Sequence, residues 1–406
     1  MEWIDRDASA LVRELAAQRP VLLVTGARQT GKTSLLQHLF PKHHYVSLDL
    51  PITAAEADES GEDFLNRHPA PLILDEVQFA PRLLHHVKAR VDADRKASGQ
   101  YLITGSQNFS VMAGVTETLA GRVSLLHLHS LSLNELERGT GLKAEGPQLL
   151  DWMLAGGYPE IHTRALTPAR FYGDYVATYL QRDVRQVLEV RNLRDFERFL
   201  RLLALRSGQQ LVLNTFASEL GINPATVKSW LSVLEASQIV YLLQPYFRNL
   251  GKRLVKTPKV YFMDTGLLCF LAGIQSTTAL AQSSMLGHIF ETLALGQYIR
   301  SRHNRGLDAN IYFYRDHAGH EVDFVVPEGE ALHLIECKWA EQPNLVQPGF
   351  TELEKIMKPK HILSKTIITQ GRTRRRFRSQ GVTLSSCVDI EKALETPTAK
   401  SVAGES

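Results

Sequence analysis

Cysteine is scarce in this chain of 406 residues, which has only three, at positions 269, 337 and 387. No two of them form the closely spaced pair that a zinc ribbon or a redox motif needs. The sequence therefore encodes neither a disulfide framework nor a cysteine-based zinc site. This usage is typical of proteins of the reducing cytosol, so we expect a cytoplasmic protein.

Long apolar runs are also missing. The first ten residues hold four charged side chains, where a secretory signal needs an apolar core. No later run approaches the ~20 apolar residues that span a bilayer. We therefore expect no leader and no membrane partner.

Net charge of either sign is small. The chain has 46 Lys and Arg against 43 Asp and Glu, a formal charge of +3, so any surface that attracts nucleic acid must be local. Hydrophobic residues make up 44% of the chain, which is enough for packed cores. The length predicts roughly two to four domains.

The first third alternates short apolar runs with segments of helical length, which is typical of a parallel sheet covered by helices. The first expected strand, 21–25, is followed by a helical pattern over 34–39. A glycine-bearing stretch, 139–146, closes this region. The other expected strands are 45–49, 71–74, 101–104 and 123–128.

A phosphate-loop pattern lies between that first strand and helix. Residues 26–33, Gly-Ala-Arg-Gln-Thr-Gly-Lys-Thr, fit G-x-x-x-x-G-K-[ST]. In such a loop backbone N–H groups cradle phosphates, Lys32 reaches the β and γ phosphates and Thr33 holds Mg²⁺. We therefore predict ATP and Mg²⁺ as cofactors. The predicted nucleotide-binding residues are Gly26, Gln29, Thr30, Gly31, Lys32, Thr33, Ser34 and Asp75.

Carboxylates at the end of a buried strand should complete such a site, and residues 72–76, Leu-Ile-Leu-Asp-Glu, supply them. We expect Asp75 to hold Mg²⁺ together with Thr33, and Glu76 to polarise the attacking water. The next strand leads to Ser106, a polar residue that could sense the γ-phosphate. A solvated Asp-Glu turn is the structural alternative.

Arg122 is placed where the γ-phosphate bound to a neighbouring subunit would meet a cation. Arginines in that position accelerate phosphoryl transfer strongly. This role needs a homo-oligomer, a ring with a hexamer as one arrangement. A surface arginine that begins a strand is the alternative.

Together these motifs resemble a bacterial and archaeal family of AAA+ ATPases whose members carry a carboxy-terminal domain of unknown function. The resemblance extends from about residue 15 to about residue 394. It rests on residues 26–34, Leu48-Asp49, 74–78, 103–106, Gly121-Arg122 and Gly156-Gly157-Tyr158-Pro159. The last run is a family marker to which the sequence assigns no mechanism.

The middle of the chain predicts a helix-turn-helix over residues 214–231, in which Asn223 suits an N-cap and Pro224 the first helical position. A strand pair, 239–244 and 260–263, follows. We predict a winged helix with DNA as partner; packing between domains is the alternative. The expected basic wing consists of Arg248, Lys252, Arg253, Lys256 and Lys259.

Near the carboxy terminus, Glu291 is expected in a helix, Asp323 on a strand and Glu336 on the next strand, with Lys338 on the same face as Glu336. This order is similar to the PD-(D/E)xK nuclease pattern, with Val322 in place of the usual proline. The resemblance implies a metal held by Asp323 and Glu336, and a water oriented by Lys338. A relic of the fold without activity is the alternative.

We thus expect a multi-domain α/β protein. Its parts are an AAA+ P-loop parallel-sheet domain (1–145), a helical subdomain (146–206), a winged helix (207–280), a restriction-endonuclease-like α/β domain (281–394) and a disordered tail (395–406). The expected function is Mg²⁺-dependent ATP hydrolysis that acts on DNA, including branched or broken DNA. The alternative is a nucleotide-dependent switch or scaffold that binds a protein partner.

Overall fold

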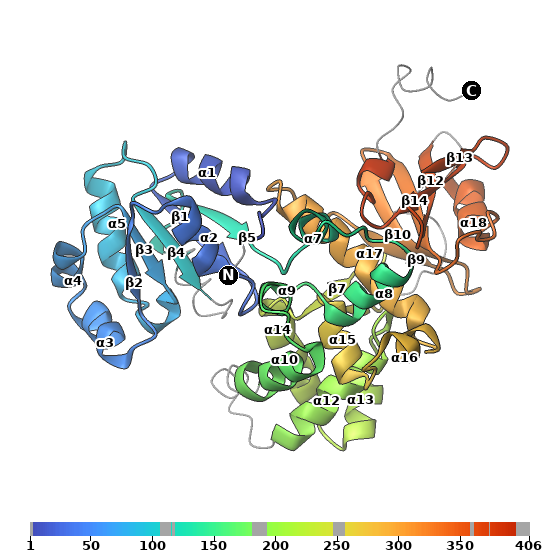
Figure 1. Ribbon diagram of the computed structural model, residues 1–406, viewed down its shortest axis with the longest axis horizontal. Coiled ribbons are helices and arrows are strands. Elements are labelled where there is room, and N and C mark those ends of the chain that lie inside the picture. Colours follow the sequence, from blue (N-terminus) through green and yellow to red (C-terminus); the bar gives the residue numbers. More distant parts are fainter. Residues whose placement is uncertain are drawn as a thin grey trace.

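The computed structural model describes residues 3–105, 115, 118–180, 193–246, 256–357, 361–372 and 374–394. Within these residues the strands form three sheets, of five, six and three strands. Figure 1 shows the five-stranded and six-stranded sheets apart from each other, with helices between and below them. Among the described helices, none is long and apolar enough to cross a bilayer.

The five-stranded sheet is parallel, in the order β2-β3-β4-β1-β5. Its central strand, β1 (Val21–Thr25), is buried at every position. A strand buried on both faces is a continuous apolar run, which is why the sequence marks it clearly. The other strands are β2 (His44–Ser47), β3 (Leu72–Asp75), β4 (Tyr101–Gly105) and β5 (Val123–His127). The predicted parallel α/β core is confirmed.

Helices cover both faces of this sheet (Figure 1). Leu22 and Val24 of β1 pack in one core with α1 (Ser9–Gln18) and α2 (Lys32–Leu39). Val21 and Leu23 pack in another. The helices on that second face are α3 (Pro51–Glu59), α4 (Gly61–Arg67) and α5 (Leu83–Ala93).

Helices dominate the region that follows the five-stranded sheet. Within the described residues they are α7 (Leu133–Thr140), α8 (Gly146–Ala155), α9 (Pro159–Thr163), α10 (Pro168–Tyr175) and the π-helix η2 (Val176–Leu180). Aromatic rings join α9 and α10, because Tyr158 lies against Phe171, Tyr172 and Tyr175.

The three-stranded sheet has the order β6-β8-β7 and is antiparallel. Phe199 contacts the rings of both Trp230 and Phe216, so three helices meet in one core. The second helix of the predicted helix-turn-helix is capped by Asn223, whose side chain accepts from the Ala225 N–H at 2.8 Å. The elements in chain order are α12 (Leu193–Leu205), β6 (Gln209–Gln210), α13 (Leu213–Leu220), α14 (Pro224–Ala236), β7 (Val240–Leu243) and β8 (Lys259–Phe262).

The six-stranded sheet is mixed, in the order β13-β14-β12-β11-β10-β9. Phe324 and Ile335 pack toward α17 (Leu286–His303), whereas Val325 and Leu334 pack toward α18 (Pro348–Met357). This alternation is the period of two expected for strands. The strands are β9 (Tyr312–Arg315), β10 (Glu321–Glu328), β11 (Ala331–Cys337), β12 (Ile362–Thr369), β13 (Arg375–Phe377) and β14 (Val382–Ser386).

Candidate functional site

The phosphate loop joins β1 to α2, and its two glycines are fixed by geometry. Gly31 caps α2 with a φ of 89°, which favours a residue without a Cβ. At Gly26 a Cβ would collide with the backbone carbonyl oxygen of Leu128. Glycine is therefore the residue that fits the backbone of this loop at both positions. The other predicted loop residues, Gln29, Thr30 and Ser34, lie on this loop and in the first turn of α2.

The ammonium of Lys32 lies within the loop. It is buried, and it donates to the carbonyl oxygens of Gly26 at 3.1 Å and Ala27 at 2.9 Å. The cation is thus positioned beside the backbone N–H groups at the start of α2. This combination of charge and N–H donors suits a polyphosphate.

Thr33 and Asp75, which the sequence predicts as partners, lie in direct contact. The Thr33 hydroxyl donates to Asp75 Oδ1 at 2.6 Å, and the Tyr45 hydroxyl donates to Asp75 Oδ2 at 3.1 Å. Burial, followed by the charge of Asp75, raises the pKa of Tyr45. A hydroxyl and a carboxylate are hard oxygen ligands, so this pair fits Mg²⁺.

Glu76 follows Asp75 in a left-handed conformation, with a φ of 58°. Its N–H donates to the Thr104 hydroxyl at 3.1 Å, and the side-chain amide of Gln78 donates to its carboxylate. A left-handed residue other than glycine is strained, and such strain clusters at functional sites. The predicted γ-phosphate sensor, Ser106, lies outside the described residues.

Arg122 is engaged within its own domain. Its Nε and Nη2 donate to the two carboxylate oxygens of Asp92, at 2.8 and 3.0 Å. These hydrogen bonds from Arg122 lower the pKa of Asp92. To reach a neighbouring subunit, the guanidinium would first have to exchange Asp92 for a phosphate.

Arg6, to which the sequence assigned no role, holds the phosphate loop from outside. Its side chain is 4% exposed, and Nη1 donates to the Thr30 carbonyl oxygen at 2.8 Å. The same guanidinium donates to the carbonyl oxygen of His129 at 2.6 Å and to Glu135 at 3.1 Å. In a trans peptide the C=O and N–H point in opposite directions. Arg6 therefore helps aim the Gly31 N–H away from itself.

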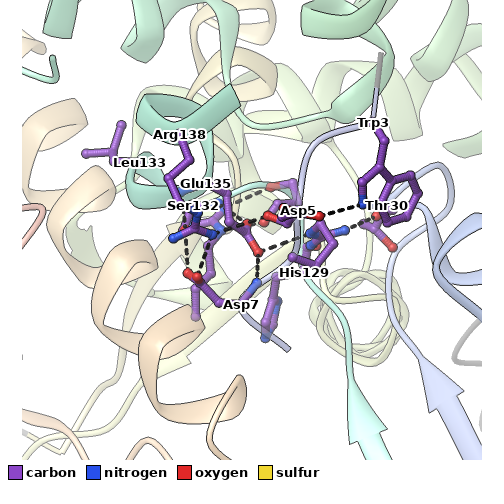
Figure 2. A network of polar contacts seen from close by, with 12 residues as sticks. Trp3, Asp5, Asp7, Thr30, His129, Ser132, Leu133, Glu135 and Arg138 are labelled. Carbon is purple, nitrogen blue, oxygen red and sulfur yellow. Dashed lines mark hydrogen bonds and ion pairs between the residues drawn. The ribbon is translucent and has the colours of Figure 1, made fainter. Parts of the chain in front are cut away.

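A polar network fixes the segment that carries Arg6 against the start of α7. Figure 2 shows Asp7, Ser132 and Glu135 turned toward one another. The Asp7 N–H donates to Glu135 Oε1 at 2.7 Å, and the Ser132 hydroxyl donates to Asp7 at 3.1 Å. Ser132 and Glu135 also form the capping box of α7.

Helix α17 binds the same region from the other side. Arg300 is buried and donates to the carbonyl oxygen of Ser130 at 3.1 Å and to the Ser130 hydroxyl at 2.8 Å. The side chain of Gln297 accepts from the Leu133 N–H at 2.8 Å. The segment that supports the phosphate loop is therefore also attached to the six-stranded-sheet domain.

The run Gly156–Pro159 acquires a physical explanation. The Gly157 N–H donates to Asp264 Oδ2 at 2.8 Å, and the Tyr172 hydroxyl donates to Asp264 Oδ1 at 2.7 Å. Asp264 also caps α15 (Thr265–Leu271). Burial, and next the charge of Asp264, raises the pKa of Tyr172 well above its ordinary value. The marker is thus a structural junction at which α8, α9, α10 and α15 meet.

Three histidines meet where β5 approaches α17. His129 Nε2 lies 2.8 Å from His303 Nδ1, and the ring of His127 lies 5.6 Å from that of His303. Burial, followed by the charge of His127, lowers the pKa of His303 to about 4; Asp308 opposes this shift and Arg302 reinforces it. Burial and the neighbouring rings also lower the pKa of His129 well below its ordinary value.

These histidines should make the folded state sensitive to acid. Between its ordinary pKa and about 4, His303 takes up a proton in the unfolded chain but not in the folded one. We expect the free energy of unfolding to fall by about 2 kcal/mol between about pH 7 and about pH 5 from His303 alone. Urea denaturation at both pH values measures this fall.

His303→Asn should flatten the pH dependence, whereas the exposed His44→Gln should leave it unchanged. An identical pH dependence in His303→Asn and in the unsubstituted protein would contradict the assignment.

Of the predicted nuclease-like residues, Glu291 lies on α17, Asp323 on β10 and Glu336 on β11, whereas Lys338 comes directly after the end of β11. Asp323 Oδ2 accepts from the Cys337 N–H at 2.9 Å, and Lys338 donates to Glu336 Oε1 at 2.8 Å. Burial, and then the charge of Glu291, raises the pKa of Asp323 well above its ordinary value. In the described part of the chain, no three His, Cys, Asp or Glu side chains are grouped to hold a metal ion.

Lys259 corrects the prediction of a basic wing. Instead of pointing to solvent, its side chain is 3% exposed and is ion-paired with Glu291 and Glu321. Its burial alone would lower the pKa of Lys259, but the carboxylates, Glu291 foremost, raise it well above the ordinary value. Lys256 is exposed. The other predicted wing residues, Arg248, Lys252 and Arg253, lie outside the described residues.

An open cleft of about 820 Å³ lies beside this lysine. Its lining includes Lys259, Glu291, Asp323 and Lys338, and also Trp339, whose indole packs edge-on against a phenyl ring of α17 at 5.3 Å between centroids. The cleft thus brings together most of the predicted nuclease-like residues and three residues of the three-stranded sheet, Gln209, Gln210 and Lys259.

Three family matches divide the chain. Residues 18–137 match the family described as an AAA domain, residues 146–278 a domain of unknown function (DUF8612) and residues 286–389 a domain of unknown function (DUF4143). The first part is therefore a P-loop ATPase domain of the AAA type, and a DUF4143 domain lies at the carboxy-terminal side. The predicted combination is confirmed at this level.

Two relatives are similar over most of the chain. An uncharacterized protein of Mycobacterium tuberculosis (strain H37Rv) and one of Mycobacterium bovis are each 28% identical over 349 residues, which is 84% of this chain and 75% of the relative.

Among solved structures, the Walker-type ATPase of Pyrococcus abyssi is 16% identical, with a TM-score of 0.45, over 66% of this chain and 96% of its own. The RuvB Holliday junction branch migration motor of Thermotoga maritima is 17% identical, with a TM-score of 0.31, over 59% of this chain and 89% of its own. At these scores the likeness supports no conclusion about this chain.

Proposed function

We propose that this protein is a cytoplasmic, Mg²⁺-dependent ATPase that acts on DNA. The observation that carries the ATPase part is the contact between Thr33 and Asp75 beside the phosphate loop. These two residues come from different elements, α2 and β3, and their oxygens lie 2.6 Å apart. They are the pair of ligands that a Mg²⁺-nucleotide site of the P-loop type requires.

The roles of the residues follow from their positions. Lys32 would neutralise the β and γ phosphates, while Thr33 and Asp75 would hold Mg²⁺, which withdraws charge from the phosphate oxygens. Glu76 would orient the attacking water and accept its proton. Its carboxylate is held by Gln78, and its backbone by the Thr104 hydroxyl.

The DNA part of the proposal rests on the region from α12 to β8. Its order of helix, strand, helix, helix, strand, strand, with an antiparallel sheet, is the order of a winged helix. On α14, Lys228 and Ser229 are exposed, whereas Val227 and Trp230 are buried. One face of the second helix of the helix-turn-helix is therefore open to a duplex.

The experiment that tests the whole proposal is ATP hydrolysis with and without DNA. We expect basal, Mg²⁺-dependent turnover that single-stranded, duplex or branched DNA changes. If ATP turnover is present but no DNA form changes it, and no DNA binds, the second candidate function is favoured instead. That candidate is a nucleotide-dependent switch or scaffold for a protein partner. Lys259 favours it, because the lysine is ion-paired with Glu291, a carboxylate that the predicted nuclease would use.

DNA contact through this region should depend on salt. The double variant Lys228→Ala/Lys256→Ala removes two exposed cations, and it should reduce the slope of log affinity against log salt by roughly one unit for each phosphate that the variant no longer neutralises. Fluorescence anisotropy over a series of salt concentrations measures this slope. Removing the exposed cation of Lys42, in the AAA-type domain, serves as the control. An unchanged slope in the double variant would contradict DNA binding by this region.

A homo-oligomeric ring belongs to the same proposal, with Arg122 acting on the nucleotide of the next subunit. Its pairing with Asp92 gives the resting position of the guanidinium. Nucleotide binding by the neighbour would supply the competing anion.

A further inference from the structure

Strand β8 sends two side chains to one carboxylate of the six-stranded-sheet domain. The ammonium of Lys259 donates to Glu291 Oε1 at 3.1 Å, and the Tyr261 hydroxyl donates to the same oxygen. Lys259 is also ion-paired with Glu321, at the start of β10. Strand β8 therefore places a positive charge between two acids of the six-stranded-sheet domain, one on α17 and one on β10.

A buried ammonium is costly unless carboxylates compensate it. The side chain of Lys259 is 3% exposed, and that of Glu291 is 8% exposed. Removing Lys259 would leave the buried charge of Glu291 without its lysine partner, so the two elements are held together electrostatically. The contact between β8 and α17 is thus a buried ion pair and not an exposed one.

The carboxylates that the nuclease resemblance assigns to a metal are already engaged. Glu336 accepts from Lys338, and one oxygen of Asp323 accepts from the Cys337 N–H. The oxygen of Glu291 nearest to β8 is occupied by Lys259 and Tyr261. A divalent cation needs several free oxygen ligands, so these residues as arranged do not fit the metal that the resemblance implies.

We propose that Lys259 is a built-in counterion of the carboxylate cluster formed by Glu291, Asp323 and Glu336. For as long as β8 stays docked on α17, the lysine keeps divalent cations out of this cluster. The lysine lies on the wall of the open cleft of about 820 Å³ beside Asp323. Its two partners, Glu291 and Glu321, line the same cleft, so a divalent cation entering there meets carboxylates whose negative charge the ammonium already offsets. In this state the domain does not cleave a substrate through a metal held by these carboxylates. The proposal goes beyond ATP hydrolysis and does not depend on it.

The test is Mn²⁺ binding by the full-length, nucleotide-free protein, followed by electron paramagnetic resonance. We compare the unsubstituted protein with Lys259→Met and with Lys259→Met/Asp323→Asn. Lys259→Met should gain one Mn²⁺ site, roughly tenfold or more tighter than any site of the unsubstituted protein. The added Asp323→Asn should remove that site, which distinguishes it from the phosphate-loop region.

A matched control is Lys365→Met, because Lys365 is a partly buried lysine paired with Glu354 at 2.7 Å. That variant should gain no Mn²⁺ site. The proposal is overturned if the unsubstituted protein already binds Mn²⁺ tightly through Asp323, or if folded Lys259→Met gains nothing.

Should Lys259→Met fail to fold, amine acetylation of the unsubstituted protein, read by mass spectrometry, tests the docking itself. Lys259 should react roughly 100-fold more slowly than the exposed Lys256. Equal reactivity of the two lysines would overturn the proposal. Because ATP turnover is measured separately in each protein, failure of this inference is distinguishable from failure of the proposed function.

Discussion

Glu76→Gln protein should bind ATP with nearly unchanged affinity and hydrolyse it roughly 100-fold or more slowly. The substitution keeps the shape of the side chain but removes the carboxylate that accepts a proton from water. Backbone support is retained, because the Glu76 N–H donates to the Thr104 hydroxyl irrespective of the side chain. Steady-state turnover and equilibrium binding of a fluorescent ATP analogue measure the two quantities.

Lys32→Ala provides the contrast, because the buried ammonium lies within the phosphate loop. This variant should lose ATP affinity itself. Glu62→Gln, which neutralises an exposed carboxylate paired with Arg90, should change neither quantity. If Glu76→Gln and Lys32→Ala lose ATP affinity to the same degree, the assignment of Glu76 as the water-activating base is wrong.

Gly156→Ala should destabilise the protein by roughly 3–5 kcal/mol. The φ of 70° and ψ of −167° at Gly156 lie in a region that is essentially restricted to glycine. In addition, a Cβ would collide with Asp264 Oδ1 and with the Tyr172 hydroxyl, which are hydrogen-bonded to each other. The substitution therefore strains the backbone and breaks the junction at once. Chemical denaturation measures the decrease in stability.

Gly141→Ala is the matched control. Gly141 ends α7 with a φ of 74°, but a Cβ there would meet nothing within 4 Å. Gly141→Ala should lower the free energy of unfolding by only about 1 kcal/mol, which is the penalty for an alanine in a left-handed conformation. Equal destabilisation in the two variants would mean that the collisions with Asp264 and Tyr172 contribute nothing.

The parallel sheet could be predicted because its signal is local. Strand β1 and the phosphate loop that follows it are contiguous in the sequence. Because both faces of the strand are buried, its apolar run together with the glycines of the loop predicts this part of the structure. Strand ends shifted by one or two residues: the run predicted at 45–49 is β2 over 44–47. Such ends depend on pairing partners, which a single sequence does not show.

Lys259 could not be placed from the sequence for the opposite reason. It follows Lys252, Arg253 and Lys256, and a cation in such a stretch is normally solvated. Its burial depends on Glu291 and Glu321, which lie far along the chain. No local sequence pattern predicts a buried lysine whose ion-pair partners lie on α17 and β10.

Arg6 and the run Gly156–Pro159 show the same limit. Arg6 is one charge in an acidic amino-terminal segment, and its acceptors Thr30 and His129 become neighbours only on folding. The Gly157 N–H likewise reaches Asp264 across 107 positions of sequence. In each case the acceptor lies far along the chain from the donor, and a single sequence does not show which remote residues meet.

Trp339 lies in the wall of the cleft beside Lys259, so its fluorescence is a natural probe of that cleft. Its indole rests edge-on against a phenyl ring of α17, half-shielded from water. The other three tryptophans, Trp3, Trp152 and Trp230, do not line this cleft. In a chain that keeps Trp339 alone, the intrinsic emission would therefore report changes in the wall of this cleft without any attached dye.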